Sequence, residues 1–459
     1  MRLVLVFVCV FAFQIAKCER TYLEVGRTAH WMDPNDANRG PYYGQPEQVH
    51  LSYGGDPSRQ IVTWLTFDDT VKSYVEYGTD RFSTKVAANV TLFRDGGHKK
   101  TIRFIHRAVM TGIKPGKRYV YRVGSQYGIS NVFTFTGLTE RPDGGYRFAV
   151  FGDMGNKNAR SLGTIQREVQ DGEIDMILHV GDFSYNLDTD NGAFGDEYMR
   201  QIEPAAAYVP YMTVVGNHEQ KYNFSHYINR FTMPNTDHNI FYSFDIGDVH
   251  FVVLSAELYF YTKYGTDQIQ TQWNFLNDDL TKANENRKNV PWIIALFHRP
   301  MYCSSRKDAD CMHKKSITRT GLNGKYGLEQ LFHKYGVDVA FFAHQHLYER
   351  FYPVYNRTAY RNVSNPYYDP PAPVYIMSGS AGCQEKLGHF GPPQPWTAFT
   401  SSSYGFHRMH VYNKTHIHFE QYGVKEEGIE DQMLLVKHNH GPYTLHDEQL
   451  LQQLGTYVD

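Results

Sequence analysis

The stretch YRFAVFGDMG at residues 146–155 decides the fold, because it is an apolar run that stops at a Gly-Asp pair. The same form returns in IDMILHVGDFSY at residues 174–185. Between the two, residues 158–171 have the apolar spacing of a helix. A strand, a helix and a second strand in this order predict a parallel sheet with a crossover helix, whose strands end at one edge.

The region that follows continues this α/β pattern. Apolar strand candidates lie at 211–215, 250–255, 292–297 and 337–343, and strands with turns return at 374–380, 405–412 and 415–421. We therefore expect an α/β domain over residues 141–425, with mixed sheets flanked by helices. Residues 426–459 are predicted to form a peripheral C-terminal tail with one possible strand, Met433–Val436.

The residues before the α/β domain have a different sequence pattern. Residues 19–45 are polar and read as an irregular lead-in, whereas residues 46–140 hold short alternating segments separated by Gly and Pro turns. This spacing predicts an all-β sandwich that resembles a fibronectin type III-like domain. It contains no cluster of acids and histidines, so we expect a scaffold. The strand candidates are 49–53, 60–65, 73–78, 101–104, 107–110 and 118–124.

The composition disfavours one class of function, and the N-terminus indicates the cellular compartment. The chain has 459 residues, with 46 Lys and Arg against 48 Asp and Glu, which disfavours a basic nucleic-acid binder. Residues 1–18 have a positive start, an apolar run from Leu3 to Phe13 and the small-residue end Ala16-Lys17-Cys18, typical of a signal peptide. No later stretch is apolar enough to span a membrane. We expect a secreted or lysosomal protein, the alternative being an uncleaved anchor.

Entry into the secretory pathway would allow disulfide formation and N-glycosylation. After cleavage Cys303, Cys311 and Cys383 remain, and an oxidising compartment favours one disulfide and one thiol. Cys303 and Cys311, eight residues apart, are the first choice among three pairings; three reduced thiols are the alternative. Glycosylation sequons, which predict surface positions, occur at Asn89, Asn223, Asn356, Asn362 and Asn413.

Residues able to bind a metal directly follow the ends of five predicted strands. They supply two carboxylates, a phenol, an amide and three imidazoles, a mixture too large for one tetrahedral zinc. Two metals that share one carboxylate suit this set better, and Asp182 is the expected bridge. The donors are Asp153, Asp182, Tyr185, Asn217, His298, His344 and His346.

These motifs, together with Leu347-Tyr348-Glu349-Arg350, resemble the purple acid phosphatases of the calcineurin-like metallophosphoesterase superfamily, in the large two-domain type. The resemblance implies Fe³⁺ bound by Asp153, Tyr185 and His346. It implies a divalent ion, Fe²⁺, Zn²⁺ or Mn²⁺, bound by Asn217, His298 and His344, with Asp182 bridging. Ala343 and Ala295 stand where the family usually has Gly and Val, and neither position supplies a ligand.

The implied activity is hydrolysis of phosphate monoesters at mildly acidic pH by in-line attack of a metal-bound hydroxide. His218 follows a ligand directly, so we expect it to face the phosphate rather than only pack beside the site. His313 is the second candidate, because the family places a histidine on the loop after the His298 strand; an exposed surface residue is the alternative. Glu219 is a candidate to orient an imidazole, with a solvated carboxylate as the alternative, and His179 is expected in the core. Arg299 could help to attract phosphate, but a surface salt bridge is the favoured expectation.

Two other functions are compatible with the residues. A related metallophosphoesterase specific for diesters or nucleotides would share the ligands and differ in the walls of its pocket. A secreted metal- or glycan-binding protein without enzymatic activity would have the fold alone, yet every expected ligand is present. The natural substrate and the oligomeric state cannot be predicted from these residues.

Overall fold

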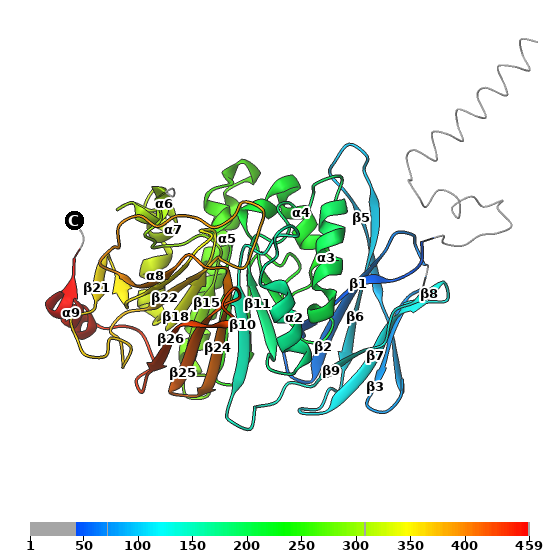
Figure 1. Cartoon of the computed structure of the whole chain (residues 1–459), viewed down its shortest axis with the longest axis horizontal. Coiled ribbons are helices and arrows are strands. Elements are labelled where there is room, and N and C mark those ends of the chain that lie inside the picture. Colours follow the sequence, from blue (N-terminus) through cyan, green and yellow to red (C-terminus); the bar gives the residue numbers. More distant parts are fainter. Residues whose placement is uncertain (1–42, 71, 307–308, 458–459) are drawn as a thin grey trace, which may run out of the picture.

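The computed structural model describes residues 43–70, 72–306 and 309–457 (Figure 1). The predicted signal peptide at 1–18 and most of the lead-in lie outside these residues. Two parts follow one another along the long axis of the molecule, an all-β part coloured blue to cyan and an α/β part coloured green to red. The predicted fold class, a β-sandwich before an α/β domain, is confirmed.

The N-terminal part consists of two antiparallel sheets. The first has the order β1-β2-β6-β5 and the second β4-β3-β7-β8, with β9 also paired to β7. The sequence predicted two strands at 101–104 and 107–110, but β6 is one continuous strand from Ile102 to Thr111, paired along its length with β2. The other bounds are β1 Glu47–Tyr53, β2 Arg59–Thr66, β3 Tyr74–Gly78, β4 Thr84–Ala87, β5 Asn89–Arg94, β7 Arg118–Ser125, β8 Gly128–Ile129 and β9 Phe133–Thr136.

The first sheet of the α/β part has the order β12-β11-β10-β24-β25-β26. The quoted motif strands pair in parallel, with Phe148 opposite Met176. Helix α2 (Leu162–Gln170) connects them, as the strand–helix–strand pattern predicts. The bounds are β10 Tyr146–Phe151, β11 Met176–Val180, β12 Tyr211–Val214, β24 Gly405–Asn413, β25 His416–Gly423 and β26 Gly428–Val436.

The sheet continues past the predicted domain boundary at residue 425. Strand β26 pairs with β25 over its whole length, with Phe419 opposite Met433. Its residues alternate between buried and exposed, and Met433 and Leu435 join the main hydrophobic core. The predicted strand Met433–Val436 is therefore the end of a longer strand that belongs to the domain. Beyond it lie α9 (Leu445–Leu454) and the short β27 (Gly455–Thr456).

A second sheet, with the order β13-β14-β15-β18-β22-β19-β23, packs against the first. Aromatic rings fill the space between them: the centroids of Phe148 in β10 and Phe251 in β14 are 5.2 Å apart, and those of Phe341 in β18 and Phe419 in β25 are 6.1 Å apart. The bounds are β13 Tyr242–Ile246, β14 Val249–Val253, β15 Trp292–Leu296, β18 Val339–Phe342, β19 Tyr348–Phe351, β22 Val374–Ser378 and β23 Thr397–Ser401.

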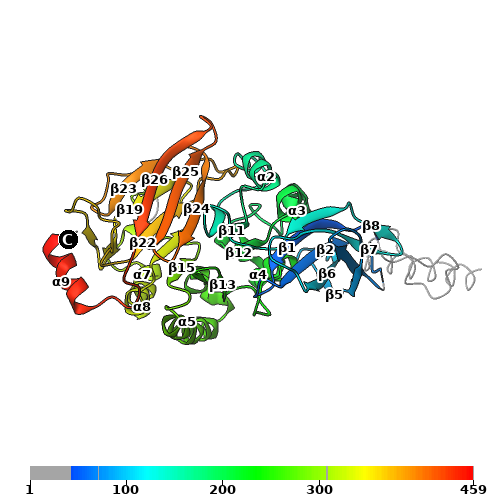
Figure 2. The same cartoon turned by 90° about the horizontal axis from the view of Figure 1, so that it is seen from below.

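Helices and short elements surround the two sheets. In Figure 2, α5 and α8 lie together below the second sheet, while α2 and α3 lie near the β-sandwich end of the first. Among the described residues no helix is long and apolar enough to cross a membrane. The remaining bounds are α3 Ala193–Ala206, η2 Asn217–Glu219, α4 Lys221–Arg230, η3 Ala256–Tyr259, η4 Thr262–Tyr264, α5 Asp267–Glu285, α6 Ala309–Met312, α7 Ile317–Thr320, β16 Gly321–Leu322, β17 Lys325–Tyr326, α8 Leu328–Tyr335, β20 Val354–Tyr355 and β21 Thr358–Tyr360.

The loop after β15 carries the disulfide. Cys303 and Cys311 are joined, with their Cα atoms 5.5 Å apart, and Cys383 is a buried free thiol. The pairing chosen from the sequence is confirmed. The physical reason is the short separation of eight residues between Cys303, in the loop after β15, and Cys311, in the short helix α6, which lets both Cβ atoms meet.

Candidate active site

The seven predicted ligands lie at the carboxyl ends of strands from both sheets. Asp153 follows β10, Asp182 follows β11 and His344 follows β18, and all three have left-handed backbone, with φ of 59°, 54° and 69°. Non-glycine residues rarely adopt this conformation, and such backbone strain gathers at functional sites. Here it turns each side chain out of its strand direction and over the end of the sheet.

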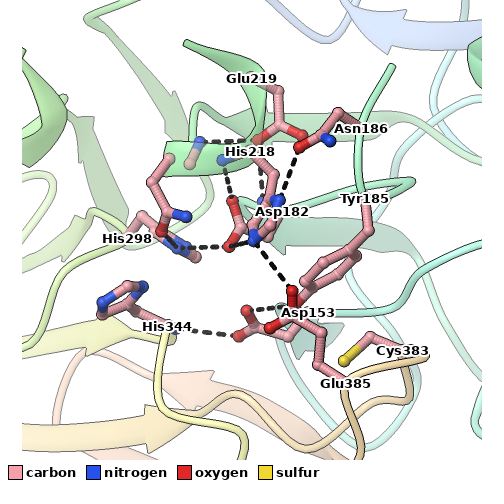
Figure 3. A network of polar contacts seen from close by, with 12 residues as sticks. Asp153, Asp182, Tyr185, Asn186, His218, Glu219, His298, His344, Cys383 and Glu385 are labelled. Atoms are coloured by element: carbon pink, nitrogen blue, oxygen red, sulfur yellow. Dashed lines mark hydrogen bonds and ion pairs between the residues drawn. The ribbon is translucent and has the colours of Figure 1, made fainter. Parts of the chain in front are cut away.

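A first group of donors consists of Asp153, Tyr185 and His346. The Tyr185 hydroxyl donates to Asp153 Oδ1 at 2.8 Å and lies 2.9 Å from His346 Nε2. His346 Nε2 is 3.4 Å from the same carboxylate oxygen. All three polar atoms therefore point at one another although they come from three separate loops, as Figure 3 shows for Asp153 and Tyr185.

A second group contains Asp182, Asn217, His298 and His344. His298 Nε2 lies 3.1 Å from Asp182 Oδ2 and 3.1 Å from Asn217 Oδ1. Ligand atoms of Asp182, His298 and His344 all lie within 4.8 Å of one another, as a shared metal ion would require. The two groups are adjacent, since the backbone N–H of His344 donates to Asp153 Oδ2 at 2.9 Å.

The orientation and the pKa of the imidazoles are those expected of ligands to two metal cations. Nδ1 of His298 contacts the Val180 carbonyl at 2.9 Å and Nδ1 of His346 contacts the Lys386 carbonyl at 2.8 Å, which leaves Nε2 of each directed at the carboxylates. Burial opposes a charge on His298, yet Asp182 raises its pKa to about 10. A metal cation would satisfy the same negative field in place of that proton.

The phenol and the third imidazole fit as well. Burial, together with Asp153 and Asp182, raises the pKa of Tyr185 well above 10, and a nearby cation reverses such a shift because it stabilises the phenolate. Burial and the Arg299 guanidinium hold the pKa of His344 well below its usual value. His344 is therefore neutral, which is the form that binds metals.

Glu219 holds the loops that carry the ligands rather than an imidazole. Its fully buried carboxylate accepts hydrogen bonds from the backbone N–H groups of Asp182, Phe183 and Gly216, each at 3.0 Å. Burial and the Asp182 charge raise its pKa to about 8. Gly216 is required here by close approach, because any Cβ at this position would collide with Asp182 Oδ1. The β11 and β12 loops are thus joined directly below the site.

His218 lies beside both donor groups. Its Nε2 is 4.0 Å from Asp182 Oδ2 and 3.7 Å from Glu385 Oε1, and its ring centroid is 4.3 Å from that of Tyr185. Its Nδ1 contacts Asn186 Oδ1 at 2.6 Å (Figure 3). Sequence reasoning missed both Asn186 and Glu385. Asn186 gave one signal, its place next to a ligand, whereas Glu385 belongs to a loop with no motif.

The remaining candidates have different surroundings. His313 is exposed, and its backbone carbonyl accepts a hydrogen bond from Arg319 Nη2 at 2.7 Å. Its proposed contact with substrate stays a prediction. His179 is a core residue, as expected, with Nδ1 2.6 Å from the Tyr211 hydroxyl. Arg299 pairs with the fully buried Glu257 at 2.9 Å rather than forming a surface ion pair.

Fold and site together define a metallophosphoesterase, and family models match three consecutive regions. The model of calcineurin-like phosphoesterases matches residues 146–348. The model of the purple acid phosphatase N-terminal domain matches residues 46–137. The model described as iron/zinc purple acid phosphatase-like protein C matches residues 372–432.

Whole-chain relatives agree with these models. The chain is 46% identical to acid phosphatase type 7 of Danio rerio over 88% of this chain and 94% of that protein. It is 32% identical to phosphoenolpyruvate phosphatase of Allium cepa, over 83% of this chain and 79% of that protein. A purple acid phosphatase from yellow lupin shares the fold, with a TM-score of 0.73 over 86% of this chain and 74% of that one, at 24% identity.

The chain belongs to the purple acid phosphatase family. It is an acid phosphatase, a hydrolase of phosphate monoesters with a dinuclear metal site of the iron/zinc type.

Proposed function

We propose that the seven donors form two metal sites that share Asp182. Asp153, Tyr185 and His346 would hold Fe³⁺, because a phenolate is a hard anionic donor. Asn217, His298 and His344 would hold the divalent ion. The observations that support this division are the contacts of Tyr185 and His346 with Asp153 and, separately, those of His298 with Asp182 and Asn217. The Asp182 charge also acts on Tyr185 of the first group. Two cations so held would neutralise charge on a phosphoryl group and would lower the pKa of a water ligand.

The protein's own residues complete the chemistry. His218, 22% exposed, reaches the solvent-facing side of the site while Asp182 is fully buried behind it. A departing alkoxide needs a proton or a positive neighbour, and the imidazole of His218 can supply either at the leaving oxygen. Arg299, held by Glu257 and stacked over Phe260 at 4.1 Å, keeps positive charge beside His344.

The ferric assignment has a direct spectroscopic test. Purified protein should contain about two metals per chain, one of them iron, and absorb visible light through the Tyr185 phenolate. Tyr185→Phe should lose that band. Tyr198→Phe is the matched control, because Tyr198 is equally buried and bonds to His179 rather than to the donor groups. Colourless, iron-free and fully active wild-type protein would contradict the assignment.

We also propose passage through the secretory pathway, for secretion or lysosomal delivery, with N-glycans on the mature chain. All five sequon asparagines are exposed, as attachment requires: Asn89, Asn223, Asn356, Asn362 and Asn413. At Asn413 the Thr415 hydroxyl donates to the Asn413 amide oxygen at 3.0 Å. Enzymatic removal of N-glycans from protein secreted by eukaryotic cells should lower its mass; an unchanged mass would refute glycosylation.

A further inference from the structure

Three contacts hold His218 in place, one through its backbone and two through its ring. Its backbone N–H donates to Asp182 Oδ1 at 2.8 Å, its face lies against the Tyr185 ring, and its Nδ1 contacts Asn186 Oδ1 at 2.6 Å. The first contact places the backbone and the second limits the tilt of the ring. Only the contact with Asn186 determines which ring nitrogen faces the donor groups.

Asn186 is well suited to hold this contact because its own position is constrained. The side chains on both sides of it, Tyr185 and Leu187, are 3% and 1% exposed. Its carbonyl accepts from the Thr189 N–H at 3.1 Å, and its own N–H donates to the Thr189 hydroxyl at 3.4 Å. The backbone of Asn186 is therefore fixed by contacts that do not involve His218, and its amide oxygen lies within hydrogen-bond distance of Nδ1.

The contact has a chemical consequence for His218. An amide oxygen accepts hydrogen bonds, so the Nδ1–H of His218 points at Asn186 and Nε2 is turned toward Asp182 and Glu385. In the imidazolium form both nitrogens carry hydrogen, and the hydrogen on Nε2 is the one that can pass to the leaving oxygen. An amide also carries no charge. Asn186 thus orients the imidazole without adding a third carboxylate beside Asp182 Oδ2 and Glu385 Oε1.

We propose that Asn186 is the positioning residue of His218 and that it acts on the reaction only through that ring. The proposal rests on the proposed role of His218 at the leaving oxygen. Its effect should be largest for esters with poor leaving groups, since these depend most on a proton at the leaving oxygen, and small for aryl esters with good ones.

The test compares Asn186→Ala with wild type on two monoesters, an alkyl phosphate and p-nitrophenyl phosphate. We expect kcat to fall about tenfold on the alkyl ester and about twofold on the aryl ester, with two metals per chain retained. Asn186→Asp keeps an oxygen acceptor but adds a negative charge, so it should lose less of the alkyl rate than Asn186→Ala does without reaching the wild-type rate. In the His218→Ala background, Asn186→Ala should have no further effect on either ester.

Three results would overturn the proposal. They are equal losses on the two esters, a metal content that falls in Asn186→Ala, or a further loss when Asn186→Ala is added to His218→Ala. Each would show that Asn186 supports the fold or the metal site instead. Failure of the proposed function is distinguishable, because His218→Ala itself would then hydrolyse both esters at the wild-type rate.

Discussion

Asp182→Ala should lose both metals and at least about 10³-fold in kcat on a phosphate monoester, since a single oriented electrostatic donor in a catalytic site is already worth roughly 10²–10³. Asp182 is fully buried and lies 3.1 Å from His298, and its backbone is joined to Glu219. Burial would raise its pKa, but His298 and His218 hold it well below its ordinary value, so it is ionised. Its removal leaves positively charged neighbours without a partner and both metal sites without their shared oxygen donor.

Metal analysis of the purified variant, together with its kcat, decides this prediction. Asp278→Ala is the matched control, because Asp278 is exposed on α5 and belongs to no donor group. The control should keep two metals per chain and wild-type activity. Retention of either metal by Asp182→Ala would show that the bridge lies elsewhere.

Asp196→Ala should lower the free energy of unfolding by about 3–5 kcal/mol, the usual loss when one partner of a buried ion pair is removed. Asp196 in α3 accepts from Arg103 of β6 at 2.7 Å and from Arg230 of α4 at 2.8 Å. These three side chains are almost fully buried where the β-sandwich meets the α/β domain. Without the carboxylate, two guanidinium groups would remain buried without their counter-ion.

The same carboxylate makes stability depend on pH. Burial would raise its pKa, but Arg230 and Arg103 hold it well below its ordinary value, so its contribution is present above about pH 4 and is lost as the pH falls further. Urea unfolding at pH 6 and at pH 3 measures both effects. Glu47→Ala is the control at the same interface: its ion pair with Arg200 is partly exposed and should contribute about 0–1 kcal/mol. Equal losses in the two variants would refute the prediction.

Some residues of the site could be predicted from the sequence and others could not. Asp153, Asp182 and His298 could be found because each directly follows an apolar strand, a local pattern that any strand-end ligand shows. Asn186 and Glu385 could not, because each lies on a loop and their meeting at His218 depends on how two distant segments fold together. The strand β26 was cut short for a similar reason, since its alternation is clear only once β25 lies beside it.

The sequence by itself determined the kinds of donor, the strands that end in them and the disulfide, because each is encoded within about ten consecutive residues. The tertiary structure alone decided how these strands are divided between two sheets. Strands β10, β11 and β12 bring Asp153, Asp182 and Asn217 from one sheet, while β15 and β18 bring His298 and His344 from the other. The two sheets bury their aromatic faces against each other, and this packing brings the carboxyl ends of their strands to the same edge. Contacts such as that of Phe148 with Phe251 join residues far apart in the chain, so no short stretch of sequence predicts them.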